Sequence, residues 1–143
     1  MRIRPHILKS EAECDCGCGA MPFNKWIDVV EKFIVICEFS VPISSMARCK
    51  AYNTKIGSKE TSAHRFYRDT DLNWIISGKA FGAADLKCRD GKKRMAMLST
   101  AVLLKDLGLI NNIEVCDRHI HIAFVPKGHK HYGKCYHGMS VSG

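Results

Sequence analysis

The feature that most constrains the fold is a short run of alternating histidine and isoleucine between Asp117 and Phe124. Alternation of polar and apolar side chains is typical of a β-strand with one buried face, because residues i and i+2 of a strand point to the same side. His119 and His121 are therefore expected to present their imidazoles next to each other. Such a pair occurs on solvated strand faces and in metal sites, and the rest of the chain must decide between the two.

The size and composition of the chain indicate one domain. It has 143 residues, of which 46% are hydrophobic, enough for a sizeable core. We expect a single domain over residues 1–143, with a Cys/Gly-rich segment at 1–20 and a loop-like tail at 126–143. No apolar run approaches the roughly 20 residues of a membrane-spanning helix, and no signal peptide is recognisable at the N-terminus. We expect a monomer without a membrane span, made in the cytoplasm.

The formal net charge of +8 favours polyanionic partners, because a net positive charge steers such molecules toward the protein. The basic residues are spread along the chain, and their one short cluster is Lys92–Arg94. No helix-turn-helix, RNA-recognition or zinc-finger pattern accompanies them. We therefore expect no specific nucleic-acid partner, and an anionic cell wall suits the charge.

Eight cysteines in a chain without a recognisable signal peptide indicate a reducing compartment. Cys14, Cys16 and Cys18 alternate in a segment that resembles a thiolate metal site. No second CxxC and no nearby CxxH completes a tetrahedron of ligands. We interpret these thiols as structural or incidental, and a second zinc site is the alternative.

Two stretches have helical periodicity. The first begins near Asn24 and should end before Pro42. Its apolar residues recur at steps of three and four: Trp26, Ile27, Val29, Val30, Phe33, Ile34 and Cys37. The second is expected from Arg94 to Leu107, with Gly108 just past its end.

Apolar and alternating runs predict the strands. Trp74–Ile76 and Phe81–Cys88 suit short strands, and a third strand is expected from Ile113 past His121 until Pro126 ends it. Together with the helices, these strands predict an α+β fold with a small, mostly antiparallel sheet.

Two residues upstream offer metal ligands in addition to His121. Hydrolytic zinc sites commonly use three nitrogen or carboxylate ligands and leave one position open for water. His64 and Asp85 have suitable side chains, and each follows small residues, in Ser-Ala-His and Gly-Ala-Ala-Asp. For each, an ordinary role as a loop histidine or a strand-end carboxylate is the alternative.

Three segments in order then resemble a known family. They are SSMARCKAYNTKIGSKETSAH at 44–64, GKAFGAADLKC at 78–88 and DRHIHIAF at 117–124. This pattern is similar to that of the zinc D-Ala-D-Ala carboxypeptidases, which include phage L-alanyl-D-glutamate endopeptidases and share their metal-site fold with the Hedgehog signalling domain. The Cys/Gly-rich start also resembles phage and bacterial members, so the likeness covers about residues 11–124.

The resemblance implies a fold and a ligand set. The fold would be Hedgehog/D-Ala-D-Ala carboxypeptidase-like, and one catalytic Zn²⁺ would be held by His64, Asp85 and His121. Arg48 would bind the substrate carboxylate, for which a planar guanidinium is well suited.

The resemblance also implies a general base shortly before the last zinc ligand. Asp117 is the nearer acid, and on a strand that is regular from 117 it would share a face with His119 and His121. His119 would then stabilise the oxyanion or orient the water. Glu114 is the alternative base, because a bulge near Asp117 would change which acid points inward.

One departure from the family pattern concerns the spacing between two ligands. The family usually places the histidine seven residues before the aspartate, whereas an inserted loop at 65–77 separates His64 from Asp85 here. Either the loop is enlarged and His64 still reaches the metal, or the ligand is lost. The retained Ser-x-His context and the small cost of loop insertion favour the first. The insertion, with Phe66, Tyr67 and Trp74 among its residues, would line the substrate groove or form a lid.

The expected function is therefore a zinc metallopeptidase that hydrolyses peptidoglycan stem peptides, acting as a carboxypeptidase or an endopeptidase. A phage endolysin or tail-associated lysin fits this expectation: it would be made in the host cytoplasm and released to the cell wall through a holin. The alternative is a non-catalytic, zinc-stabilised binding module of the same fold.

Overall fold

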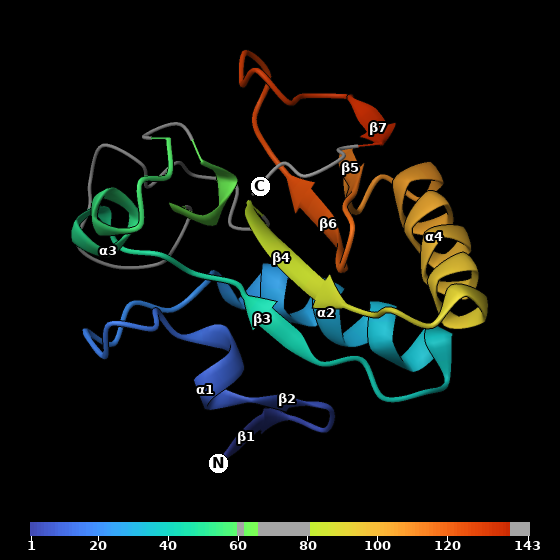
Figure 1. Ribbon diagram of the computed structural model, residues 1–143, viewed down its shortest axis with the longest axis horizontal. Coiled ribbons are helices and arrows are strands. Elements are labelled where there is room, and N and C mark those ends of the chain that lie inside the picture. Colours follow the sequence, from blue (N-terminus) through green and yellow to red (C-terminus); the bar gives the residue numbers. More distant parts are fainter. Residues whose placement is uncertain (60–61, 66–80, 138–143) are drawn as a thin grey trace.

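A computed structural model describes residues 1–59, 62–65 and 81–137 (Figure 1). Its strands are β1 (Arg2–Arg4), β2 (Ile7–Leu8), β3 (Ile43–Ser45), β4 (Gly82–Lys87), β5 (Asn112–Val115), β6 (His119–Phe124) and β7 (Cys135–His137). Its helices are α1 (Lys9–Ala12), α2 (Asn24–Cys37), α3 (Lys50–Lys55), the 3-10 helix η1 (Ala63–Arg65) and α4 (Gly91–Asp106).

The main sheet has five strands in the order β3-β4-β6-β5-β7. All neighbours are antiparallel except β5 and β7, which run parallel. A separate antiparallel pair, β1 and β2, lies near the N-terminus (Figure 1). The prediction of an α+β fold with a small, mostly antiparallel sheet is confirmed. The strand with the two histidines, β6, lies at the centre of this sheet.

The first predicted helix agrees closely with α2. All seven apolar residues expected on its inner face are buried, and the helix ends at Cys37, before Pro42, with Glu38 in the left-handed conformation. The second helix, α4, begins three residues before the expected start at Arg94. Asp90 explains the difference, because its side chain accepts a hydrogen bond from the backbone N–H of Lys93 and so caps the first turn. Gly108 follows the helix with φ +77°, as expected for a C′ glycine.

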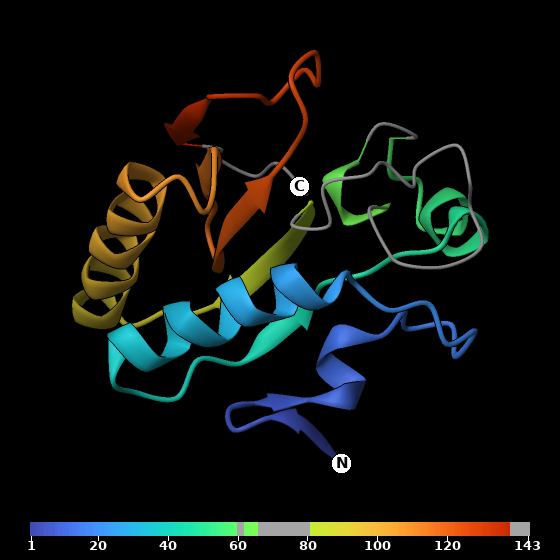
Figure 2. The ribbon, with the colours of Figure 1, turned by 180° about the vertical axis from the view of Figure 1, so that it is seen from behind.

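The two faces of the main sheet have different surroundings. One face contributes isoleucine, leucine and alanine side chains to a core that α2 and α4 share, among them Ala84, Leu86, Ile113, Ile120 and Ile122. Figure 2 shows α2 running across this side of the sheet, with α4 beside it. The residues between these apolar positions point to the opposite face, because successive side chains of a strand alternate. The isoleucines of β6 therefore face the core under α2 and α4, and its histidines point to the opposite face of the sheet.

The segment after Asn111 differs from its prediction as one strand. It forms a hairpin in which β5 and β6 pair antiparallel, with Ile113 opposite Ile122. The chain reverses at 116–118, where the hydrogen bond from the Cys116 backbone N–H to the His119 carbonyl closes the turn. The alternating pattern is similar in a long strand and in a hairpin of two short ones, and no glycine marks this turn. A strand that is regular from Asp117, the condition for Asp117 to share a face with the two histidines, is therefore not formed.

Two terminal segments are more ordered than expected. The tail predicted as a loop contributes β7 at the edge of the sheet, where Ile113 pairs with Cys135. The segment 1–20 contains β1, β2 and α1 before its Cys/Gly-rich part. The predicted strand Trp74–Ile76, the groove-lining or lid residues Phe66, Tyr67 and Trp74, and the end of the tail lie outside the described residues.

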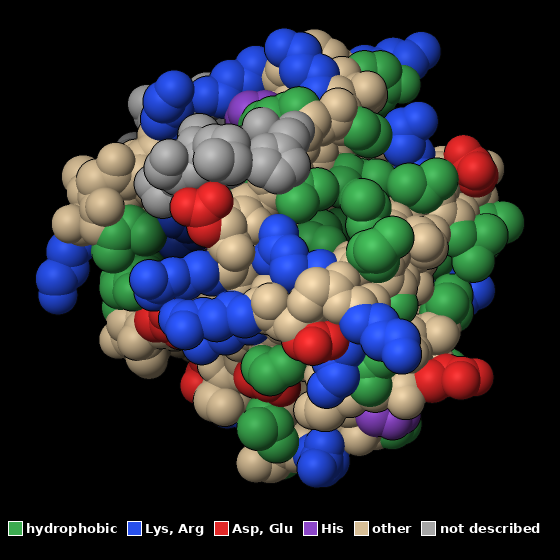
Figure 3. Space-filling model, turned by 45° about the vertical axis from the view of Figure 1, so that its right-hand side comes forward, with side chains coloured by type: hydrophobic (Ala, Val, Ile, Leu, Met, Phe, Trp, Pro, Cys, Tyr) green, Lys and Arg blue, Asp and Glu red, His purple; other side chains and the backbone are tan. Residues whose placement is uncertain are grey.

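The surface of the described part of the chain agrees with a dispersed positive charge. In Figure 3, Lys and Arg side chains occur in several separate groups with acidic and apolar side chains between them. Several large apolar side chains of α4 are exposed, with Met95 the most exposed at 73%. None of the described helices combines the length and the apolar character that crossing a bilayer requires.

Candidate metal centre

A row of polar side chains crosses the face of the main sheet that points away from α2 and α4. The register places Ser45 opposite Asp85, Asp85 opposite His121, His121 opposite Glu114, and Glu114 opposite Tyr136. Each strand of the sheet contributes one residue to this row. Directly opposed side chains lie on the same face, with Cβ atoms roughly 4.5–5.5 Å apart in antiparallel pairs. The sheet therefore lines up two carboxylates, an imidazole and two hydroxyl groups.

His64 joins the row from outside the sheet. It lies on η1, and its side chain is fully buried. Its Nε2 is 3.4 Å from Oδ2 of Asp85, and Nδ1 of His121 donates to Oδ1 of the same carboxylate at 2.9 Å. Ligand atoms of His64, Asp85 and His121 all lie within 4.8 Å of one another. The structure thus brings together the three residues that the sequence suggested as ligands, although an inserted loop separates two of them.

The orientation of His64 leaves one ring nitrogen free for a ligand. Nδ1 lies 2.9 Å from the backbone carbonyl of Met46, and a carbonyl only accepts, so Nδ1 carries the proton. Nε2 then presents a lone pair and has no hydrogen-bond partner despite its burial. Burial also lowers the pKa of His64, which favours the neutral ring. Metal-binding histidines commonly have this arrangement, with the second nitrogen held by a carbonyl or carboxylate.

Asp85 lies at the centre of the cluster. Burial alone would raise the pKa of its carboxyl group, but His64 and His121 outweigh that effect and hold the pKa well below its usual range. Nε2 of His119 is 3.6 Å from Oδ1 of Asp85 and also lacks a hydrogen-bond partner. Asp85 is therefore an anionic side chain between three imidazoles.

The three donors are compatible with a metal ion. Around tetrahedral Zn²⁺ with nitrogen and oxygen ligands at about 2.0–2.2 Å, adjacent donors lie about 3.3–3.6 Å apart. The 3.4 Å contact from Asp85 to His64 is close to this spacing, whereas the 2.9 Å contact from Asp85 to His121 is that of a hydrogen bond. The unpartnered Nε2 of His64 supports the same conclusion, since a buried nitrogen without a partner is costly. Two imidazoles and one carboxylate are also a common ligand set of hydrolytic zinc sites.

The two candidate bases have different environments. Glu114 is 3% exposed and opposes His121 in the sheet. Its Oε2 accepts a hydrogen bond of 3.0 Å from the Tyr136 hydroxyl, while its Oε1 is buried without a partner. Asp117 is exposed and lies in the hairpin turn, outside β6. The strand geometry that would have placed Asp117 beside His119 and His121 is therefore absent, and of the two candidate bases Glu114 is the one in the polar row.

Arg48 lies next to the cluster. Its backbone N–H donates to the His64 carbonyl at 2.8 Å, and its guanidinium donates to the Ser62 hydroxyl at 3.2 Å. The residue is only 7% exposed, and its Nε has no hydrogen-bond partner. Burial lowers the pKa of Arg48, while Asp85 acts in the opposite direction. Within the described ranges no carboxylate forms an ion pair with Arg48, so the guanidinium retains the ability to bind an anion.

Tyr136 and the cysteine Cys49 were not singled out by the sequence. Tyr136 lies in the segment predicted to be loop, and only the pairing of β7 with β5 places it beside Glu114. Cys49 lies in a group with Cys14, Cys16 and Cys18, all of whose sulfur atoms are within 4.8 Å of one another. The described part of the chain therefore has two groups of side chains compatible with a metal ion.

In comparisons with known proteins, no protein-family model, curated protein or solved structure matches the chain.

Proposed function

We propose that this protein is a zinc-dependent peptidase that hydrolyses peptidoglycan stem peptides, as a phage endolysin or tail-associated lysin would. The observation that carries the proposal is the convergence of His64, Asp85 and His121 from three separate elements onto one site. His64 and Asp85 are separated in the sequence by the inserted loop. Their positions along the chain therefore do not by themselves bring them together, and their convergence depends on the tertiary structure. The order of the three motifs supports the substrate class.

A zinc ion at this site would polarise the scissile carbonyl and lower the pKa of water toward neutrality. Glu114, which opposes His121 in the sheet, would take a proton from that water and pass it to the departing amine as the C–O bond forms and the C–N bond breaks. The Tyr136 hydroxyl holds one oxygen of Glu114, which leaves the other free for the proton. His119 borders the same carboxylate of Asp85 and would stabilise the developing oxyanion.

Arg48 would position the substrate. A stem peptide carries free carboxylates, and a guanidinium binds a carboxylate through two parallel hydrogen bonds. The burial of Arg48 strengthens such a bond, because the local dielectric constant is low. The net charge of +8 would favour approach to the anionic cell wall.

The test measures zinc content and cleavage of purified muropeptides on the same samples. We expect the wild type to cleave and His64→Ala to lose both the catalytic zinc and cleavage. His6→Ala is the matched control, because His6 lies on the surface, paired with Glu31, and the substitution should leave both readouts intact. Cleavage by His64→Ala at the wild-type rate would refute the ligand assignment. A wild type that binds zinc and cleaves nothing would instead support the zinc-stabilised binding module.

A second pair of variants tests the base. Glu114→Gln keeps the size of the side chain and removes its basicity, so we expect kcat to fall by about 10²–10⁴-fold with zinc retained. Asp117→Asn changes the acid in the exposed turn and should reduce kcat far less. If the two effects are reversed, Asp117 is the base, as the sequence suggested.

A further inference from the structure

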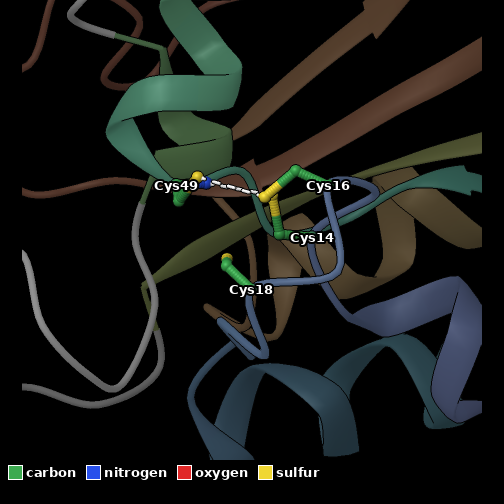
Figure 4. Close-up of side chains that lie close together, drawn as sticks. All are labelled: Cys14, Cys16, Cys18 and Cys49. Carbon is green, nitrogen blue, oxygen red and sulfur yellow. Dashed lines mark hydrogen bonds between the residues drawn. The ribbon is translucent and has the colours of Figure 1, made fainter.

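We propose that Cys14, Cys16, Cys18 and Cys49 form a second metal site, a structural tetrathiolate that binds Zn²⁺. Three of these cysteines lie in the loop after α1, and the fourth immediately precedes α3. Figure 4 shows the three loop cysteines gathered against Cys49. This site is separate from the candidate catalytic centre and does not depend on the proposed function.

The distances match a metal better than they match a disulfide. Cys14 Sγ is 3.5 Å from Cys16 Sγ, which is 3.6 Å from Cys49 Sγ. Around a tetrahedral zinc with Zn–S bonds of about 2.3 Å, sulfur atoms lie about 3.8 Å apart. A disulfide needs about 2.05 Å, and all four thiols are free. Four sulfur atoms within 4.8 Å of one another leave room for one ion among them.

Backbone N–H groups point at the sulfur atoms. The amide of Cys49 donates to Cys14 Sγ at 3.4 Å, and the amide of Tyr52 donates to Cys49 Sγ at the same distance. Hydrogen bonds from amides to sulfur are stronger when the sulfur is a thiolate, the form that binds a metal. These two N–H groups would therefore stabilise the thiolate form of Cys14 and Cys49 when a metal is bound.

The loop has a conformation that glycine makes possible. Gly17 and Gly19 have φ of +80° and +88°, a region that residues with a Cβ rarely adopt. The amide of Gly17 closes a turn on the Cys14 carbonyl, and the amide of Cys14 bonds to the Ala20 carbonyl. The chain therefore folds back on itself between successive cysteines, which brings three alternating thiols to one side.

Hydrophobic burial alone is a weak force for holding this loop. The fully buried residues of its cluster are Cys14, Ala20 and Ala47, with Cys49 and Tyr52 partly buried around them. Each alanine methyl contributes only about 0.8 kcal/mol on burial. The segment between Cys14 and Ala20 also has no helix or strand. A metal ion supplies the stabilisation that this small cluster lacks.

The choice of zinc follows from the ligand set. Four thiolates in tetrahedral arrangement are typical of structural zinc sites and of iron–sulfur proteins. Since no ligand position is left for water, this site has no hydrolytic role. Its position suggests a supporting role, because Cys49 directly follows Arg48 and lies three residues after Met46, whose carbonyl orients His64.

The experiment measures metal stoichiometry and the absorption spectrum of the full chain purified under reducing conditions. We expect one zinc ion per chain at the cysteine site, which Cys49→Ser loses and His64→Ala retains; a zinc ion at the candidate catalytic centre would add a second in the wild type and in Cys49→Ser. Replacement of zinc by Co²⁺ should give intense thiolate-to-cobalt charge-transfer bands in the wild type and in His64→Ala. These bands require no cysteine variant, so the test survives if Cys49→Ser fails to fold.

Two further variants test which cysteines bind the metal. Cys18→Ser changes an exposed member of the cluster, and we expect loss of one zinc and of the tetrathiolate spectrum. Cys135→Ser is the matched control, an exposed cysteine outside the cluster, and should retain the zinc content and the spectrum of the wild type. A Co²⁺ protein without charge-transfer bands, or zinc content unchanged in both Cys18→Ser and Cys49→Ser, would overturn the proposal. Loss of cleavage with this site intact would concern the catalytic centre alone.

Discussion

Removal of metal from the cysteine site should lower the thermal stability by an amount that follows from the chain topology. The site joins Cys16 to Cys49, which are 33 positions apart. Closing a loop of this length removes about 12 cal/mol/K of entropy from the unfolded chain in the cross-link model, or about 3.7 kcal/mol at 25 °C. Unfolding entropies average about 2.1 cal/mol/K per residue, so this chain should lose about 12 °C in Tm.

The measurement uses His64→Ala, so that the cysteine site is the one remaining metal site under study. Its Tm is recorded by calorimetry with and without a strong zinc chelator, with a reductant present so that the freed thiols do not form a disulfide. Zinc content is measured on the same samples. Cys49→Ser in the same background provides the comparison, because its Tm should be low already and insensitive to the chelator.

One result would refute this reasoning. If the chelator removes the last zinc ion and Tm falls by less than about 2 °C, the ion does not cross-link the two segments in the folded state. A fall much larger than about 12 °C would be compatible with the reasoning, because loop closure counts only the restriction of the unfolded chain and leaves out direct metal–ligand bonding.

Three further predictions concern the sheet and the candidate centre. In Gly82→Ala, the new Cβ would lie 2.5 Å from the Trp26 ring, so we expect a loss of about 1–3 kcal/mol in urea unfolding; an unchanged midpoint would contradict the packing. Arg48→Lys keeps the charge but loses the planar fork, so KM should rise about tenfold or more with zinc content unchanged, and an unchanged KM would remove Arg48 from substrate binding. The metal-free protein should lose stability as pH falls below about 6.5, because burial lowers the pKa of His64 in the folded state and the unfolded chain then binds more protons. Urea titrations of wild type and His64→Ala across this range measure the effect, and equal slopes would show that His64 does not cause it.

The sequence predicted those parts of the fold whose patterns are local. The inner face of α2 was predicted residue by residue, because its apolar spacing is regular and no competing pattern interrupts it. The hairpin of β5 and β6 was not predicted, since Cys116, Asp117 and Arg118 lack the glycine or asparagine–glycine signal of a tight turn. The edge strand β7 was missed because its pairing with β5 depends on contacts between distant segments.

The candidate centre was predictable to a similar extent. His64, Asp85 and His121 were selected by motif, and their convergence depends on tertiary structure that no local pattern encodes. The sequence ranked Asp117 above Glu114 by distance along the chain. That ranking assumed a continuous strand, and the hairpin turn placed Asp117 in solvent. Cys49 was not predicted as a partner of the loop cysteines, because it lies more than thirty positions away in the sequence and only the tertiary structure brings it near them.

The alternation within β6 has a consequence for folding. Shifting this strand by one residue against its neighbours would turn His119 and His121 toward α2 and α4 and place Ile120 and Ile122 among the polar side chains of the opposite face. Each imidazole without a partner in that apolar layer would cost about 1–3 kcal/mol. The two histidines of β6 therefore disfavour a misaligned sheet before any ligand or substrate is present. Substitution of either histidine by an apolar residue would remove this energetic penalty on the wrong register as well as a functional group.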